Sequence, residues 1–462
     1  MNINTLVLLI FLRLLSALPF AVYYSSLQLY LLNIHITKNI ATPIVGSVLA
    51  LSYGTALVGG YIGGKYISYR ALFLFCLICA VLGCFAFTTY NLSYILWFSS
   101  LFLLSSAGLT ISLNMMVTQG YESHDEGREK AFFWIYMGLN IGYLIGYSIS
   151  GYYGSLGEYQ KIPVFVAGCS FICILLTVAY WKQIDKPRIP YNKFALIYTL
   201  FVFIILLCVL RFLLQFPTIT NLSVIVVWIL LSLIMFFILM RHNVNHSHDI
   251  VIFYILLFGA LVFWSIYFLA PMALIVFIHN NVTLNLFNLG IAPQWIQNIN
   301  TFVIILGTVI LGSKRSKKPT GTYKIARQFS WGLFFIGISF IILIIGIVLH
   351  SEQNKVSLVW VISAYVLQSL GELFIGPISY ALVGRLIPKH YHSFMMGIWI
   401  TLLGVANAIS SKLSVLAPYT EKSALNLLQY QHFFASISLS IILAAIFIYL
   451  ISFKLTRLNV AS

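Results

Sequence analysis

The sequence predicts an all-α integral membrane protein, and composition, apolar runs and charge distribution are the three observations that predict it. Of its 462 residues, 61% are hydrophobic and only 8% are charged, whereas a soluble domain carries about 25% charged residues. These charged side chains are too few to cover the surface of a soluble protein of this size. The apolar excess must therefore face lipid. The apolar runs are continuous, which excludes the alternating strands of a membrane β-barrel.

Fourteen apolar runs of about 18 residues or more predict transmembrane helices. We expect the first to be a membrane helix and not a cleaved signal, because no Lys or Arg precedes Arg13. The predicted spans cover residues 6–32, 42–63, 71–90, 94–118, 131–155, 162–181, 194–215, 221–240, 249–279, 295–313, 328–349, 356–384, 393–416 and 432–453.

The basic residues support this count. If the N-terminus lies in the cytoplasm, alternating loops place nineteen of the 26 Lys and Arg residues inside and four outside. That asymmetry is the positive-inside pattern of membrane proteins, and it predicts that both termini are cytoplasmic. It also accounts for the net charge of +16 without a nucleic-acid partner.

Two basic loops, around residues 182–193 and 314–327, organise the chain. We expect an N-terminal six-helix bundle over 1–181, a linker with two accessory transmembrane helices over 182–248, and a C-terminal six-helix bundle over 249–462. Two six-helix halves are the layout of the major-facilitator fold, whose substrate binds near the membrane midplane between the halves.

Glu372 is the one acidic residue deep inside a predicted span. A charge at a helix centre costs roughly 2.5–3.5 kcal/mol on insertion scales, so it must be paired, protonated or wetted by a cavity. Gly371, Gly376 and Pro377 let the helix bend nearby. The functional interpretation is a cavity carboxylate that binds an amine or a cation, or that titrates. The structural alternative is a Glu bonded to a Ser or Asn of the next helix.

Arg13 and Lys412 are cations within predicted spans. If Arg13 faces the cavity, it is the natural partner of a substrate carboxylate; the alternative for both cations is a side chain that reaches to solvent. The chain has no GxxxxGK[ST] loop, and its few acidic and histidine side chains are scattered. We therefore expect no enzyme, no cofactor and no metal site.

Four stretches, in order over residues 50–404, carry recognisable motifs. They read LSYGTALVGGYIGGK, DEGREKAFFWIYMGLNIG, FWSIYFLAPMALIVFIHNNV with PQWIQNIN, and AYVLQSLGELFIGPISYALVGRLIP with FMMGIWITLLG. Together they resemble the proton-dependent oligopeptide transporter family of the major facilitator superfamily, particularly its bacterial di- and tripeptide permeases. The bacterial type also has two accessory helices between its halves.

The resemblance implies a peptide cavity lined by six residues. In it Glu372 would pair with the peptide amino terminus, while the other side chains would bond its backbone or pack its side chains. The alternative for Trp399 and Tyr267 is ordinary helix packing. The six residues are Tyr53, Asn140, Tyr267, Asn300, Glu372 and Trp399.

The chain also departs from the family. No acidic residue precedes Glu122, so the ExxER motif that the family ties to proton coupling is absent. The fourth-span lysine is replaced at or near Ile111, the aspartate after the second span by Gly64, and a seventh-span glutamine by Leu269. Proton coupling is therefore in doubt, and Glu372 is the remaining candidate for it.

These observations predict a divergent, multi-pass secondary transporter that moves small peptides or related amine-bearing solutes by alternating access. We expect a monomer in the bacterial inner membrane whose partners are the solute, the lipid bilayer and, if it is a symporter, protons. Two alternatives stay open: a carrier of another solute, such as an amino acid, drug or siderophore, and a solute sensor that does not transport.

Overall fold

The computed structural model is almost entirely helical. Thirteen helical segments of the described chain are long and apolar enough to cross a membrane. The remaining predicted span, 295–313, is helical as α13 (Gln297–Ser313, 17 residues). The all-α membrane architecture is therefore confirmed. The structure describes residues 3–121, 126–184, 193–243, 247–286, 289–313, 322–350, 355–419 and 423–460, so most of both basic loops lies outside the described residues.

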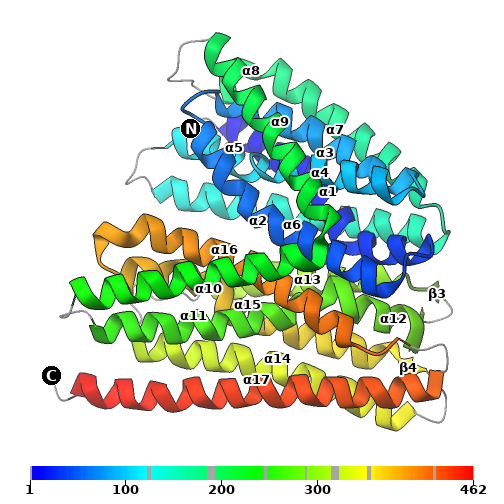
Figure 1. Cartoon of the computed structure of the whole chain (residues 1–462), viewed down its shortest axis with the longest axis vertical. Coiled ribbons are helices and arrows are strands. Elements are labelled where there is room, and N and C mark those ends of the chain that lie inside the picture. Colours follow the sequence, from blue (N-terminus) through cyan, green and yellow to red (C-terminus); the bar gives the residue numbers. More distant parts are fainter. Residues whose placement is uncertain are drawn as a thin grey trace. The chain divides into compact units, whose positions relative to one another are not determined.

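The chain folds into two compact units, Met1–Thr220 and Asn221–Ser462. In the first unit, α1 packs along α6, and α3 packs against α4, α5 and α7 (Figure 1). Its elements are α1 (Ile3–Asn33), α2 (Lys38–Ile62), α3 (Tyr69–Cys84), η1 (Phe85–Thr88), α4 (Leu92–Ser106), α5 (Leu109–Gln119), α6 (Glu126–Ser155), η2 (Tyr159–Lys161), α7 (Ile162–Ala179), α8 (Trp181–Ile184) and α9 (Lys193–Gln215).

The fourth predicted span is not one helix. It is interrupted at Ala107 and Gly108, between α4 and α5. A Cβ at Gly108 would lie 2.7 Å from the Cys76 sulfur and 2.8 Å from Leu72, so the chain passes close to α3 here. The break restarts the helix at Leu109 and places Thr110 in the first turn of α5.

Three glycines at four-residue spacing let α6 approach α1. A Cβ at Gly138 would lie 2.8 Å from the Ile10 carbonyl oxygen. A Cβ at Gly142 would overlap the Leu14 carbonyl oxygen, and one at Gly146 would overlap the Ala21 side chain. Because lipid tails are as apolar as leucine, membrane helices associate through such close packing.

We expect Gly142→Ala to lower the stability of the protein, by about 1–3 kcal/mol, because the added methyl group must push α6 away from α1. Gly168→Ala on α7 is the matched control, since no atom lies within 4 Å of its added methyl group. The test is the melting temperature of both variants in detergent. Equal melting temperatures would contradict the packing described for α1 and α6.

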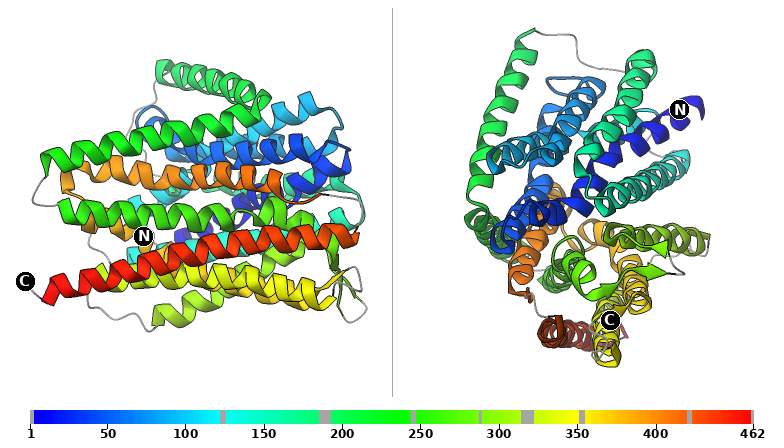
Figure 2. Two further views of the ribbon diagram at one scale, coloured as in Figure 1. Left: turned by 60° about the horizontal axis from the view of Figure 1, so that its bottom comes forward. Right: turned by 90° about the vertical axis from the view of Figure 1, so that its right-hand side faces the viewer.

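The second unit is built on long helices, and Figures 1 and 2 both show α17 running beside α14. Short strands close one end: β1 pairs parallel with β4, and β2 pairs antiparallel with β3. The elements are α10 (Pro217–His242), α11 (Ser247–Tyr267), the π-helical turn η4 (Ala270–Leu274), α12 (Ile275–Asn281), β1 (Val282–Thr283), β2 (Asn285–Leu286), β3 (Leu289–Gly290), η5 (Pro293–Ile296), α13 (Gln297–Ser313), α14 (Thr322–His350), β4 (Val356–Ser357), α15 (Leu358–Leu386), η7 (Lys389–Tyr391), α16 (His392–Leu416) and α17 (Ser423–Val460).

The helices α9 and α10 are the least buried candidate spans, with 17% and 22% of their apolar windows buried. Each is attached to its own unit: α9 packs on α4, and the Trp228 indole of α10 donates a 3.0 Å hydrogen bond to the Ile398 carbonyl on α16. Their exposed apolar faces are suited to contact with lipid.

Candidate functional site

Glu372 lies on α15 beside a very close contact between α15 and α14. A Cβ at Gly371 would lie 2.8 Å from the Gly332 carbonyl oxygen, and one at Gly332 would lie 2.6 Å from Ile375. Such spacing is open only to residues without a side chain, so the two helices meet backbone to backbone at Gly371. This contact fixes the part of α15 from which the Glu372 side chain extends.

Two side chains from other helices donate to the Glu372 carboxylate. The Tyr267 hydroxyl, at the end of α11, donates to Oε2 over 2.6 Å. The Asn300 amide, on α13, donates to the same Oε2 over 2.9 Å and also to the Ser369 hydroxyl over 3.0 Å. Both hydrogen bonds to the carboxylate therefore end on one oxygen, and three helices meet at this group.

The Glu372 side chain is half-buried. The bond from Asn300 matches the structural alternative, in which a Ser or Asn of another helix holds the glutamate. The Glu372 carboxylate also accepts a bond from Tyr267, and its side chain is partly exposed. With Oε2 held by two donors, Oε1 faces no donor among the described residues. The group can therefore accept a hydrogen bond from an external donor without losing its internal ones.

The backbone after Tyr267 explains the position of this tyrosine. The helix α11 stops there, and a π-helical turn containing Pro271 follows, with the Leu274 amide bonded to the Leu269 carbonyl over 2.9 Å. π-Helical turns are rare and occur frequently at functional sites. The Tyr267 ring packs against those of Phe263, 5.8 Å away, and Trp264, 5.1 Å away, so its hydroxyl is held in place.

Trp399 occupies a different environment. It is only 3% exposed, belongs to the apolar core of the second unit, and packs against Phe253 at 5.9 Å. This is the packing that the alternative interpretation expects, and no contact brings it to the Glu372 carboxylate.

Arg13 is buried on α1 in the first unit, with 8% of its surface exposed. Its guanidinium donates to the Thr110 hydroxyl over 3.1 Å, while its Nε has no hydrogen-bond partner. Among the described residues, no carboxylate forms an ion pair with Arg13. A buried cation without a counter-ion is a feature that calls for an anionic ligand or a neutralising environment.

The other two predicted site residues of this unit are less informative. Tyr53 is half-buried on α2. Asn140 is 7% exposed on α6, and its amide donates to the Tyr136 carbonyl one turn earlier over 2.9 Å. The predicted cation Lys412 is exposed on α16.

Sequence reasoning missed two partners. Ser369 precedes Glu372 by three residues, so helical periodicity alone places them on one face and could have indicated it. Nothing in the sequence indicated Thr110, because its contact with Arg13 depends on the break before α5.

Within the described residues, no three His, Cys, Asp or Glu side chains form a group that could hold a metal.

A family model described as PTR2, POT family, matches residues 69–432. The chain belongs to the POT family. Dipeptide and tripeptide permease A of Edwardsiella piscicida is 25% identical over 92% of this chain and 88% of its own length, and that of Serratia proteamaculans is 26% identical over 90% and 84%.

Solved structures show the same fold. A mutant of a peptide transporter POT in complex with alafosfalin superposes with a TM-score of 0.83 at 20% identity, covering 98% of this chain and 95% of that one. A POT family transporter in complex with 5-aminolevulinic acid gives a TM-score of 0.82 at 21% identity, covering 98% and 97%. The predicted major-facilitator fold is therefore confirmed, and this POT chain is a multi-pass membrane protein.

Some departures of this POT chain from its family have a structural context. Gly64 has φ +75°, and a Cβ there would collide with the Tyr69 ring, so glycine suits this turn where the family has aspartate. Leu269 is 1% exposed and begins the π-helical turn. The helix α1 contains no acidic residue, and Arg13 is its single charge.

We expect Trp399→Ala to destabilise this POT protein by about 3–5 kcal/mol, because it empties a large volume in the core. Trp399→Phe should retain most of the stability and, if the side chain acts by packing alone, the full ligand affinity. Melting temperature and ligand binding, measured on both variants, separate these effects. A Phe variant that is stable but binds at least tenfold more weakly would show that the indole contacts the ligand.

Proposed function

We propose that this chain is a secondary transporter that binds small peptides or related amine-bearing solutes at Glu372 and moves them by alternating access. The observation that carries the proposal is the half-buried Glu372 carboxylate, with Oε2 held by Tyr267 and Asn300 and Oε1 open. Its relatives are named dipeptide and tripeptide permeases, which supports the same substrate class.

The chemistry of the site suits a primary amine. A substrate ammonium group would donate to Oε1, and a charge-assisted bond of this kind is about twice as strong as a neutral one. Tyr267 and Asn300 stabilise the ionised carboxylate and fix its orientation in advance, which lowers the entropy cost of binding. A neutral solute of the same shape would lack this attraction.

Arg13 in the first unit is a further candidate for contact with the substrate. Arg13 is a buried cation with an unpartnered Nε, so it is suited to a substrate carboxylate. Tyr53 and Asn140 would bond the peptide backbone or line the path. We place the protein in the bacterial inner membrane as a monomer with both termini in the cytoplasm.

Glu372 is the candidate for coupling to protons. The α1 helix carries no acid, so the family's ExxER motif cannot contribute. A proton on Glu372 would compete directly with the substrate amine, so substrate binding and protonation would exclude each other at this carboxylate. Without such exchange the protein would be a facilitator.

A different solute is the second candidate. Ile111 is half-buried on α5, at or near the position where the resemblance implies a lysine, so one cation that could hold a carboxylate is absent. That change favours amines without a carboxylate, such as cationic drugs. A sensor would bind the same solutes and be stabilised by them but would show no counterflow.

We expect Glu372→Gln to lower dipeptide uptake into proteoliposomes by tenfold or more, because the amide has no charge to pair with the substrate amine. Glu158→Gln is the matched control, since this acid forms its ion pair with the exposed Lys161, away from Glu372. Comparable uptake by wild type and the Glu372 variant would exclude the proposed role. Binding without counterflow in wild type would favour the sensor.

We expect Arg13→Met to leave the melting temperature unchanged or raise it, because an apolar side chain removes a buried cation that lacks a counter-ion. Uptake of a dipeptide should fall, whereas uptake of its C-terminal amide should change little. If both substrates were affected equally, Arg13 would have no specific role toward the carboxylate.

A further inference from the structure

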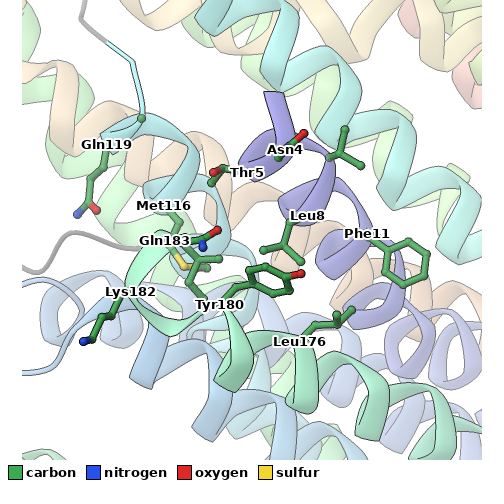
Figure 3. Close-up of a pocket in the computed structure, with 13 residues that line it drawn as sticks. Asn4, Thr5, Leu8, Phe11, Met116, Gln119, Leu176, Tyr180, Lys182 and Gln183 are labelled. Carbon is green, nitrogen blue, oxygen red and sulfur yellow. The ribbon is translucent and has the colours of Figure 1, made fainter. Parts of the chain in front are cut away.

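A pocket lies wholly within the first unit. It is lined by residues of α1, α5, α7 and α8 and has a volume of about 970 Å³ (Figure 3). This is at the upper end of the range for small-molecule sites. None of the residues assigned to substrate binding lines it, so it is separate from the proposed transport site.

The lining of this pocket is divided into a polar and an apolar side. In Figure 3, the amine of Lys182 and the amide of Gln119 extend toward one side, while Phe11 and Leu176 lie on the opposite side. The side-chain amide oxygen of Gln119, Oε1, is buried without a hydrogen-bond partner. Lys182 is the only charged side chain among the described lining residues, so the polar side is cationic.

The apolar side of the pocket continues onto exposed apolar surfaces of α1 and α7. Val7 and Phe11, which line the pocket from α1, are 59% and 45% exposed. On α7, Leu175 and Val178 are 52% and 55% exposed next to the lining residue Leu176. A ligand in the pocket can therefore extend an apolar chain along α1 and α7 into the bilayer.

The short helix α8 is fixed so that it presents Lys182 and Gln183 to the pocket. The Arg70 guanidinium of α3 donates to the Trp181 carbonyl over 2.6 Å and lies 4.6 Å above the Trp181 ring. At the other end, Ile184 is 2% exposed and packs into the core of the first unit. The cationic side of the pocket is thus held by interactions on both sides of Lys182.

We propose that this pocket binds an anionic phospholipid of the cytoplasmic leaflet. Its phosphate lies near Lys182 and Gln119, and one acyl chain follows Phe11 and Leu176. The charge distribution assigns this end of the bundle to the cytoplasm, where the membrane surface is negative. Basic pockets between membrane helices on that side bind anionic headgroups.

The test uses the purified full-length protein in detergent and measures its melting temperature against lipid concentration. Phosphatidylglycerol is the probe, with phosphatidylcholine and inorganic phosphate as comparisons. Lys182→Glu reverses the charge at the pocket, and Lys389→Glu reverses an exposed charge in the second unit as the matched control. Thr5→Trp fills the pocket without changing any charge.

We expect phosphatidylglycerol to stabilise wild type and Lys389→Glu alike, with an apparent affinity at least tenfold lower in Lys182→Glu and Thr5→Trp. Three results would overturn the proposal: equal stabilisation by phosphatidylcholine, stabilisation by inorganic phosphate to the same extent, or unchanged lipid affinity in both pocket variants. A photoreactive acyl chain on phosphatidylglycerol should label α1 and α7. Labelling confined to other helices would also overturn it. None of these readouts depends on solute transport.

Discussion

A carboxyl group inside a membrane helix is the constraint on which the second unit depends. Such a group has no stable place in lipid, so the fold must supply donors, water or a counter-ion. The structure supplies Tyr267 from α11 and Asn300 from α13, both bonded to one oxygen of Glu372. The end of α11, the π-helical turn after it and the position of α13 all contribute to this arrangement.

Close helix packing makes that arrangement possible. Burial of apolar surface does not drive helices together in lipid, so contact must come from complementary small residues. Gly371 and Gly332 allow close contact between α15 and α14, and the three glycines of α6 allow close contact between α6 and α1. The glycines that fix the position of α15 lie near Glu372, and those that fix the position of α6 lie near Asn140. Packing and site geometry are therefore linked through the same segments.

The sequence was sufficient for the helices and for the key acid, because both depend on local composition. Long apolar runs predicted every span, and the rarity of acids in them singled out Glu372. The resemblance added Tyr267 and Asn300, which do meet Glu372 in the structure. Local hydropathy could not reveal the break at Ala107 and Gly108 or the π-helical turn, because both lie inside long runs whose average remains apolar. The contact of Arg13 with Thr110 depends on that break and was equally hidden.

The account's central claim is that Glu372 pairs with a free amine of the substrate. The most direct measurement compares the affinity of the purified protein for a dipeptide and for the same dipeptide acetylated at its amino terminus. We predict that acetylation weakens binding at least tenfold in wild type and that this difference disappears in Glu372→Gln. Equal affinity of wild type for the two peptides would contradict the account.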